Sequence, residues 1–245
     1  MNETPQPHNA PVKKNSTSQR IWLNTVIFSI FLFVILCAYY LIQGHSSDLF
    51  SLNILLAITG MVLIGLSYAL SGITYFWNFA DSKLIYRKQL GLAGFYLVLV
   101  HATFSFMNYF FIPNSPKPQF ELGYTWNVAG IGISNIFAFI AGVTALAIFL
   151  FIALISTQYA MMALGGIRWR KYLRLGYIAY FIIVIHFGLK RYNEWAAWLS
   201  VRVGLPPLSL LLLIFVAFVL LLRLGLSVGL QGRKKPVVTG KQTTA

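Results

Sequence analysis

The sequence of 245 residues has little of the charge that a water-soluble domain carries. Only 10% of its residues are charged and only five are acidic, whereas 58% are hydrophobic and 16% are aromatic. The mean hydropathy is correspondingly high, at +0.73. This composition excludes an ordinary soluble domain and is typical of an integral membrane protein.

Cysteine and nucleotide-binding motifs are also scarce. The chain has one cysteine, Cys37, which excludes an intrachain disulfide and a metal centre built on several thiolates, and we interpret it as a small buried apolar residue. Gly165 and Gly166 lie in a basic loop with no strand before them, so they do not form a Gly-rich NAD, FAD or ATP loop. Any soluble redox partner would therefore be another chain.

Apolar runs long enough to cross a bilayer, which takes about 20 helical residues, predict the fold. There are six: Ile21–Ile42, Leu52–Trp77, Leu90–Ile112, Val128–Ile155, Tyr172–Leu189 and Leu208–Val228. We expect an all-α, six-helix membrane bundle over residues 21–228, with its fifth span the shortest. The tails, 1–20 and 229–245, read as flexible polar or basic segments.

The net charge of +14 predicts topology rather than nucleic-acid binding. If the N-terminus is cytoplasmic, 15 lysines and arginines fall on the cytoplasmic side and four outside. Basic residues next to membrane spans resist translocation, so both termini should be cytoplasmic. A cleaved signal peptide is a rival interpretation of the start, but Ile21–Ile42 exceeds the 7–15 apolar residues typical of a signal core.

Arg174 and Arg223 fall toward the ends of their predicted spans, so apart from weakly acidic Tyr and Cys the ionisable residues in the span interiors are two histidines, His101 and His186. Such residues are costly in a bilayer and suggest a function. A proton or cation transporter would be expected to place a carboxylate there, and the spans contain none. His8 and His45 fall in the tail and in the first outside loop, where we expect them to be solvated.

The two histidines end matching segments, GLAGFYLVLVH (Gly91–His101) and GYIAYFIIVIH (Gly176–His186). Each segment has a small residue, Gly94 or Ala179, seven positions before its histidine. These small residues could leave room for a flat macrocycle, or they could serve close packing of helices. A repeated design that offers one imidazole per helix suggests a shared ligand.

Two interpretations of the histidine pair stay open. Each imidazole could bond a neighbouring helix, or the two could be the axial ligands of one heme iron. His101 and His186 lie 14 and 15 residues beyond the basic residues Arg87 and Lys171. Because the third and fifth spans run in the same direction, the imidazoles can meet at one depth. Lys190 or Arg191 could pair with a propionate or simply mark the membrane edge.

Several segments together resemble the ferric-reductase-like transmembrane domain family, in particular its heme-binding membrane subunits of bacterial periplasmic methionine sulfoxide reductase systems. They are RKQLGLAGFYLVLVH (Arg87–His101), STQ (Ser156–Gln158), LGG (Leu164–Gly166), RW (Arg168 and Trp169) and RLGYIAYFIIVIHF (Arg174–Phe187). The similarity covers about Leu52 to Phe187. It implies a six-helix domain of the inner (plasma) membrane that carries b-type heme and passes electrons across the membrane.

The resemblance also implies roles for single residues. His101 and His186 match the family's outer pair of heme ligands, whereas the family's other fifth-helix histidine falls on Leu173, so one heme is expected. Without an inner heme, quinol in the bilayer or a separate reductase is the expected donor, a flavin remains possible, and the acceptor would be periplasmic or extracellular.

A different class of function also remains open. Leu173 stands where the family has a heme ligand, and the loss of that ligand is compatible with a protein that no longer transfers electrons. The alternative is a membrane scaffold or assembly protein that keeps the fold. Trp126, Trp195 and Trp198 are expected to form an interfacial belt, and Tyr192–Val203 could lie flat on the outer surface.

Overall fold

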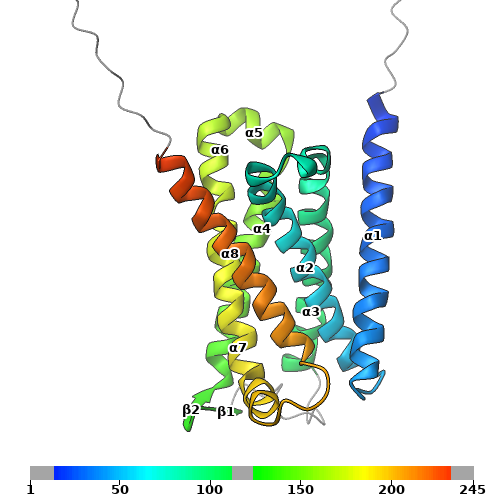
Figure 1. The fold of residues 1–245 in the computed structure, drawn as a ribbon, viewed down its shortest axis with the longest axis vertical. Coiled ribbons are helices and arrows are strands. Elements are labelled where there is room, and N and C mark those ends of the chain that lie inside the picture. The colour runs from blue at the N-terminus through cyan, green and yellow to red at the C-terminus, as the bar shows by residue number, and fades with distance from the viewer. Residues whose placement is uncertain (1–13, 112–123, 233–245) are drawn as a thin grey trace, which may run out of the picture.

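The computed structural model describes residues 14–111 and 124–232 (Figure 1). Within these ranges six helices are long and apolar enough to cross a membrane. They are α1 (Lys14–Ile42), α2 (Leu49–Phe76), α3 (Arg87–Phe110), α4 (Asn135–Ile155), α7 (Leu175–Val201) and α8 (Leu208–Gly232). The prediction of six apolar spans is therefore confirmed, and the chain has the architecture of a multi-pass membrane protein.

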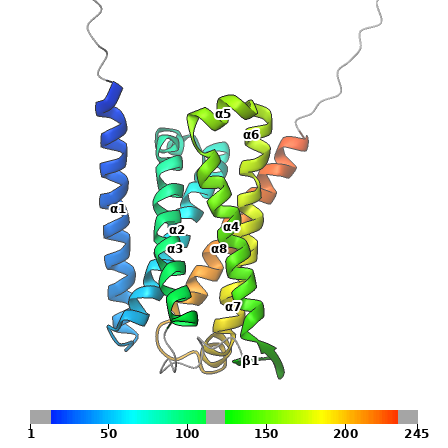
Figure 2. The same cartoon turned by 180° about the vertical axis from the view of Figure 1, so that it is seen from behind.

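Two antiparallel helix pairs form the centre of the bundle. α2 packs along α3, α4 packs along α7, and α8 crosses in front of α2 and α7 (Figure 1). α1 stands at the edge beside α2 and α3, as the opposite view also shows (Figure 2). Large apolar side chains such as Ile27, Phe31 and Val34 are exposed on α1, as a lipid-facing helix requires.

The connections gather at the two ends of the bundle. The 3-10 helix η1 (Asn78–Tyr86) and the short helices α5 (Gln158–Leu164) and α6 (Gly166–Leu173) lie at the end where α1 begins and α8 finishes (Figure 1). The first and last described residues are thus on one side of the bundle.

Several predicted boundaries differ from those of the structure. α1 begins at Lys14, inside the expected tail 1–20, and α8 continues to Gly232, into the expected tail 229–245. The rest of the tails, residues 1–13 and 233–245, lies outside the described residues. The fifth span is not short: α7 has 27 residues, because its helix continues through Lys190, Arg191 and Glu194, whose charges made the apolar run look interrupted.

The expectation of an all-α fold is confirmed, with one small addition: strands β1 (Thr125–Val128) and β2 (Ile131–Ser134) form an antiparallel hairpin before α4. Ala129 and Gly130 at its turn have φ values of 52° and 86°, as a two-residue type I′ turn requires. The Asn127 Oδ1 accepts a hydrogen bond from the Gly130 N–H at 2.9 Å. The predicted span from Val128 therefore starts as a helix only at Asn135.

The core consists of small residues and buried aromatics where the helices meet. α2 and α3 approach most closely at Gly60 and Gly94: a Cβ atom on Gly60 would lie 2.7 Å from the Gly94 carbonyl oxygen. Such glycines allow helix backbones to touch in a membrane. Tyr180 of α7 is fully buried, and its hydroxyl donates to the Met61 carbonyl oxygen of α2 at 3.0 Å, so it joins the two helix pairs.

Candidate cofactor site

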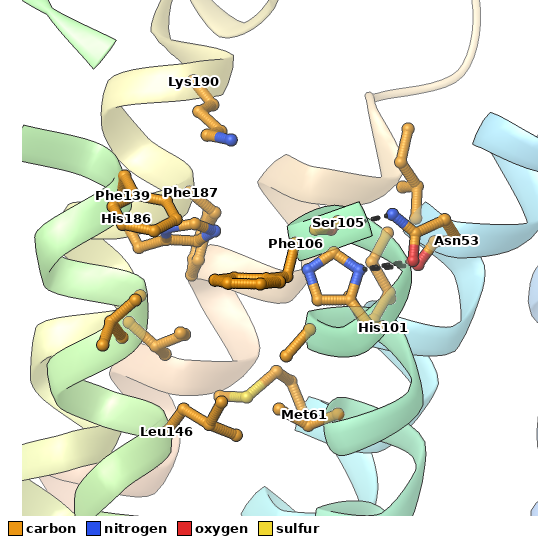
Figure 3. Close-up of a pocket in the computed structure, with 18 of the residues that line it drawn as sticks. Asn53, Met61, His101, Ser105, Phe106, Phe139, Leu146, His186, Phe187 and Lys190 are labelled. Atoms are coloured by element: carbon orange, nitrogen blue, oxygen red, sulfur yellow. Dashed lines mark hydrogen bonds between the residues drawn. The ribbon is translucent and has the colours of Figure 1, made fainter. Parts of the chain in front are cut away.

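A cavity of about 630 Å³ lies between the two helix pairs, in the half of the bundle that carries the β-hairpin. Figure 3 shows His101 of α3 and His186 of α7 on opposite sides of this cavity. Both line it, together with residues of α2, α4 and α8. The structure thus brings together the two histidines that the sequence singled out.

His101 is held by α2. Its Nδ1 lies 3.0 Å from the backbone oxygen of Asn53 and 3.0 Å from the Oδ1 of the same residue. The Asn53 Nδ2 in turn donates to the Ser105 Oγ at 3.0 Å, which fixes the orientation of the amide. Asn53 is almost fully buried, with 3% of its surface exposed, so this network is shielded from solvent.

His186 is held in a similar way by α4. Its Nδ1 lies 2.6 Å from the Ala138 carbonyl oxygen. Gly142, one turn further along α4, makes room for the ring: a Cβ atom there would lie 2.7 Å from the His186 Nδ1. The imidazole therefore packs directly against the α4 backbone.

These contacts determine the tautomer of both rings. A carbonyl oxygen can only accept a hydrogen bond, so each Nδ1 must carry the hydrogen and donate it. In a neutral imidazole the other nitrogen, Nε2, then has a free lone pair. A histidine whose Nδ1–H is bound by a carbonyl is the usual arrangement for a metal ligand, because the bond orients the ring and raises the basicity of Nε2. His101 and His186 could therefore hold a metal.

The two halves of the site are related by an internal repeat. The offset of 85 residues between His101 and His186 also separates their carbonyl partners, Asn53 and Ala138. Two glycines, Gly91 and Gly176, follow the same offset: a Cβ on Gly91 would meet Ser67, and a Cβ on Gly176 would meet Tyr68 first and then Ile152, which lies 85 residues beyond Ser67. The repeat noticed in the third and fifth spans thus extends to α2 and α4, and each half is a helix pair with one anchored imidazole.

Gly94 and Ala179, which are also related by this offset, do not line the cavity. Gly94 lies against Gly60 and Ile64 of α2, and Ala179 is fully buried in the core. The positions of these small residues favour the packing interpretation over the macrocycle interpretation.

One end of the cavity carries positive charge. Lys190 and Arg191 both line it, and Lys190 points into it in Figure 3. The Arg191 Nη1 forms an ion pair with the Glu194 Oε2 at 3.3 Å, and the same carboxylate accepts a hydrogen bond from the Ser209 Oγ at 3.3 Å. Arg191 is thereby tied to the helix end, and Lys190 is the cation that Figure 3 shows pointing into the cavity.

The remaining wall is mostly apolar and aromatic. It includes Met61, Phe106, Phe139, Leu146 and Phe187. In the view of Figure 3 the Phe106 ring lies between the two imidazoles. Phe106 is 48% exposed, and its ring packs against Phe110 with ring centres 4.5 Å apart.

Three residues of the site were not anticipated from the sequence. Asn53 is an uncharged amide, so a criterion based on ionisable residues inside the spans does not single it out. Gly142 and Phe106 are ordinary residues of apolar helices. Asn53 alone carried a usable signal, as an amide placed near the start of an apolar span, where a buried polar group needs a partner.

The fold and the site define a class: a multi-pass α-helical membrane protein with a pair of anchored imidazoles in an intramembrane cavity. Compared with known proteins, the chain matches no protein-family model and no curated protein. The resemblance to ferric-reductase-like domains therefore stays a prediction that depends on the motifs.

Proposed function

We propose that the protein is a b-type heme-binding transmembrane electron-transfer protein with one bis-histidine heme. The observation that carries the proposal is the pair of imidazoles on facing helices of one cavity, each with its Nδ1 held by a backbone carbonyl. Two such rings are the axial ligand set of low-spin cytochromes. The heme supplies the redox chemistry, and the chain supplies position and electrostatics.

The cavity suits such a group in size and polarity. Its volume of about 630 Å³ falls within the range of about 300–1,000 Å³ typical of ligand and cofactor sites. Most of the wall around the two imidazoles is apolar. Lys190 and Arg191 lie where a carboxylate group of a bound macrocycle could find a cation.

The chain offers one such pair of ligands. At the other end of the bundle, the 85-residue offset pairs Lys88 with Leu173. Neither position supplies an imidazole, so the inner ligand pair of two-heme relatives has no counterpart. This supports a single heme, placed in the half of the bundle that the charge distribution assigns to the outside.

The electron path follows from that placement. A quinol in the bilayer or a separate reductase chain would donate, and a periplasmic or extracellular partner would accept. A flavin on a donor chain is compatible with this scheme. The cell inner (plasma) membrane is the expected location, with both termini cytoplasmic.

Histidine substitutions test the proposal. The purified full-length protein should show the absorption spectrum of a six-coordinate b-type heme at a heme-to-protein ratio near one. His101→Ala or His186→Ala should each abolish that spectrum, also after added hemin. His45→Ala is the matched control, because His45 stacks on Tyr40 at 4.1 Å and does not line the cavity.

The possible results distinguish the one-heme proposal from a site with other ligands, a two-heme protein and a scaffold without heme. If both cavity variants keep the full spectrum, the axial ligand assignment is wrong. A ratio near two would contradict the single-heme proposal. A colourless protein that stays folded and takes up no hemin would favour the scaffold alternative.

A further inference from the structure

A second cavity of about 530 Å³ lies between the same two helix pairs, in the opposite half of the bundle. It is lined by residues of α2, α3, α4, α6, α7 and α8 and of η1. Phe149 of α4 lines both cavities. The second cavity is therefore the counterpart of the first, nearer the end where α5 and α6 lie.

The two cavities differ in chemistry. Basic side chains gather at the second one: Arg87, Lys88, Arg170, Arg174 and Arg223. None of its lining residues is an aspartate, glutamate or histidine. The described acidic residues, Asp48, Asp81 and Glu194, do not line it. The cavity thus carries positive charge that none of its own lining residues neutralises.

Three of the arginines come from different parts of the bundle and line the cavity with Tyr177: Arg87 begins α3, Arg174 directly precedes α7, and Arg223 lies in α8. The Arg223 Cζ lies 5.2 Å from the centre of the Tyr177 ring. Guanidinium groups brought together from α3, α8 and the start of α7 repel one another, and an anion between them would remove that repulsion.

The inner wall of the same cavity also offers a hydrogen-bonding group. The Ser71 Oγ is buried and has no hydrogen-bond partner among the described residues, and Ser71 lines the cavity. A buried hydroxyl without a partner is costly. A ligand with acceptor oxygens would satisfy it.

Much of the remaining lining is apolar. It includes Ile64, Leu92, Phe95 and Ile152, together with Phe149. Arg87 begins α3 and Arg174 directly precedes α7, so these two cations sit at the ends of spans, where phospholipid headgroups lie. Arg223 lies in the second half of α8. A ligand that fits must combine an anionic head with an apolar body.

We propose that this second cavity binds an anionic phospholipid, with its phosphate among Arg87, Arg174 and Arg223 and the start of an acyl chain along the apolar part of the lining. Basic pockets between membrane helices recognise anionic headgroups in this way. The bilayer supplies such lipids at high local concentration. The proposal does not depend on heme binding in the first cavity.

Retention of lipid by the full-length protein tests the proposal. The protein is reconstituted in phosphatidylcholine vesicles that contain a minority of phosphatidylglycerol, extracted mildly, and analysed by native mass spectrometry. The wild type should retain phosphatidylglycerol in preference to phosphatidylcholine. Arg87→Gln, Arg174→Gln and Arg223→Gln should each lower that retention about fivefold, which corresponds to about 1 kcal/mol per basic residue at a headgroup.

Arg168→Gln is the matched control, because Arg168 is an exposed residue of α6 that does not line the cavity. It should retain lipid like the wild type. Arg174 is exposed as well, so its variant should fold even if Arg87→Gln or Arg223→Gln does not. Equal retention by the Arg174 and Arg168 variants would overturn the proposal.

A phosphate group could come from a phospholipid or from free phosphate in solution, and a test with inorganic phosphate distinguishes the two. Protein in pure phosphatidylcholine vesicles is heated with and without phosphate. Lipid-selective retention without stabilisation by phosphate supports a phospholipid site. Stabilisation by phosphate that Arg174→Gln abolishes, with no preference for phosphatidylglycerol, would show a soluble anion site and refute the lipid proposal.

Discussion

At the scale of single residues, the two histidines are anchored unequally. His101 bonds both a backbone oxygen and the Asn53 side chain, whereas His186 bonds the Ala138 backbone only. At the matching positions of the repeat, His101 therefore contacts a polar side chain, that of Asn53, whereas His186 contacts the backbone of an alanine, Ala138. A second acceptor strengthens the hydrogen bonding of the Nδ1–H group and so raises the basicity of Nε2, which makes Nε2 a better electron donor to a metal.

Removing the Asn53 amide should change the heme rather than the fold. We predict that Asn53→Leu still binds heme, because the backbone oxygen remains, but with about 10–100-fold lower affinity. The less basic His101 should stabilise the ferric state less, so the midpoint potential should become more positive. Hemin titration and a spectroelectrochemical titration measure the two effects.

Asn108→Leu is the control for this change. Asn108 lies in the same helix as His101, bonds the Phe104 carbonyl oxygen at 2.8 Å, and does not line the cavity. Its variant should have the affinity and the potential of the wild type. If Asn53→Leu behaves like this control, Asn53 does not tune the site.

At the scale of elements, the contact between α2 and α3 positions His101 relative to Asn53. A Cβ atom on Gly94 would lie 2.5 Å from the Gly60 oxygen and 2.9 Å from the Ile64 nitrogen. Both are backbone atoms of α2, which cannot turn aside as a side chain can. The contact therefore tolerates no side chain at position 94 unless the helices move apart.

Gly94→Ala should destabilise the protein by about 1–3 kcal/mol through overpacking. It should also weaken heme binding, because α2 carries the anchor of His101. Thermal unfolding in detergent measures the first effect. Gly225→Ala in α8 is the control: its Cβ would meet Phe76 at an ordinary 3.7 Å, so its stability should stay equal or rise slightly through helix propensity. If Gly94→Ala and Gly225→Ala unfold at the same temperature, the contact between α2 and α3 at Gly94 does not limit the stability.

The same elements show how far the sequence could predict the structure. The six spans and the histidine pair followed from apolar run length and from the repeat. The hairpin at Thr125–Ser134 did not, because a short apolar strand and the start of an apolar helix look alike without their partners. Asn53 could not be paired with His101, since that requires knowing which helices are neighbours and in which rotation. Gly94 was ambiguous for the same reason.

At the scale of the whole molecule, two cavities share the interface between two related helix pairs. The cavity with the imidazoles lies toward the β-hairpin, and the cavity with the arginines lies toward α5 and α6. The orientation of the bundle in the membrane determines which side of the membrane, and therefore which partners, each cavity faces. If the arginine end is cytoplasmic, the imidazole site faces a periplasmic or extracellular partner.

Accessibility of single cysteines measures that orientation. Cys37 is replaced by serine, and one cysteine is then introduced at Arg168, in α6, or at Arg202, which follows α7; both positions are exposed. Because basic residues next to spans are retained in the cytoplasm, a membrane-impermeant maleimide should label Arg202→Cys in intact cells. Arg168→Cys should react only after the membrane is permeabilised. The reverse pattern would place the imidazole cavity toward the cytoplasm, where a soluble reductase could reach it directly, and the proposed direction of electron flow would then have to be reversed.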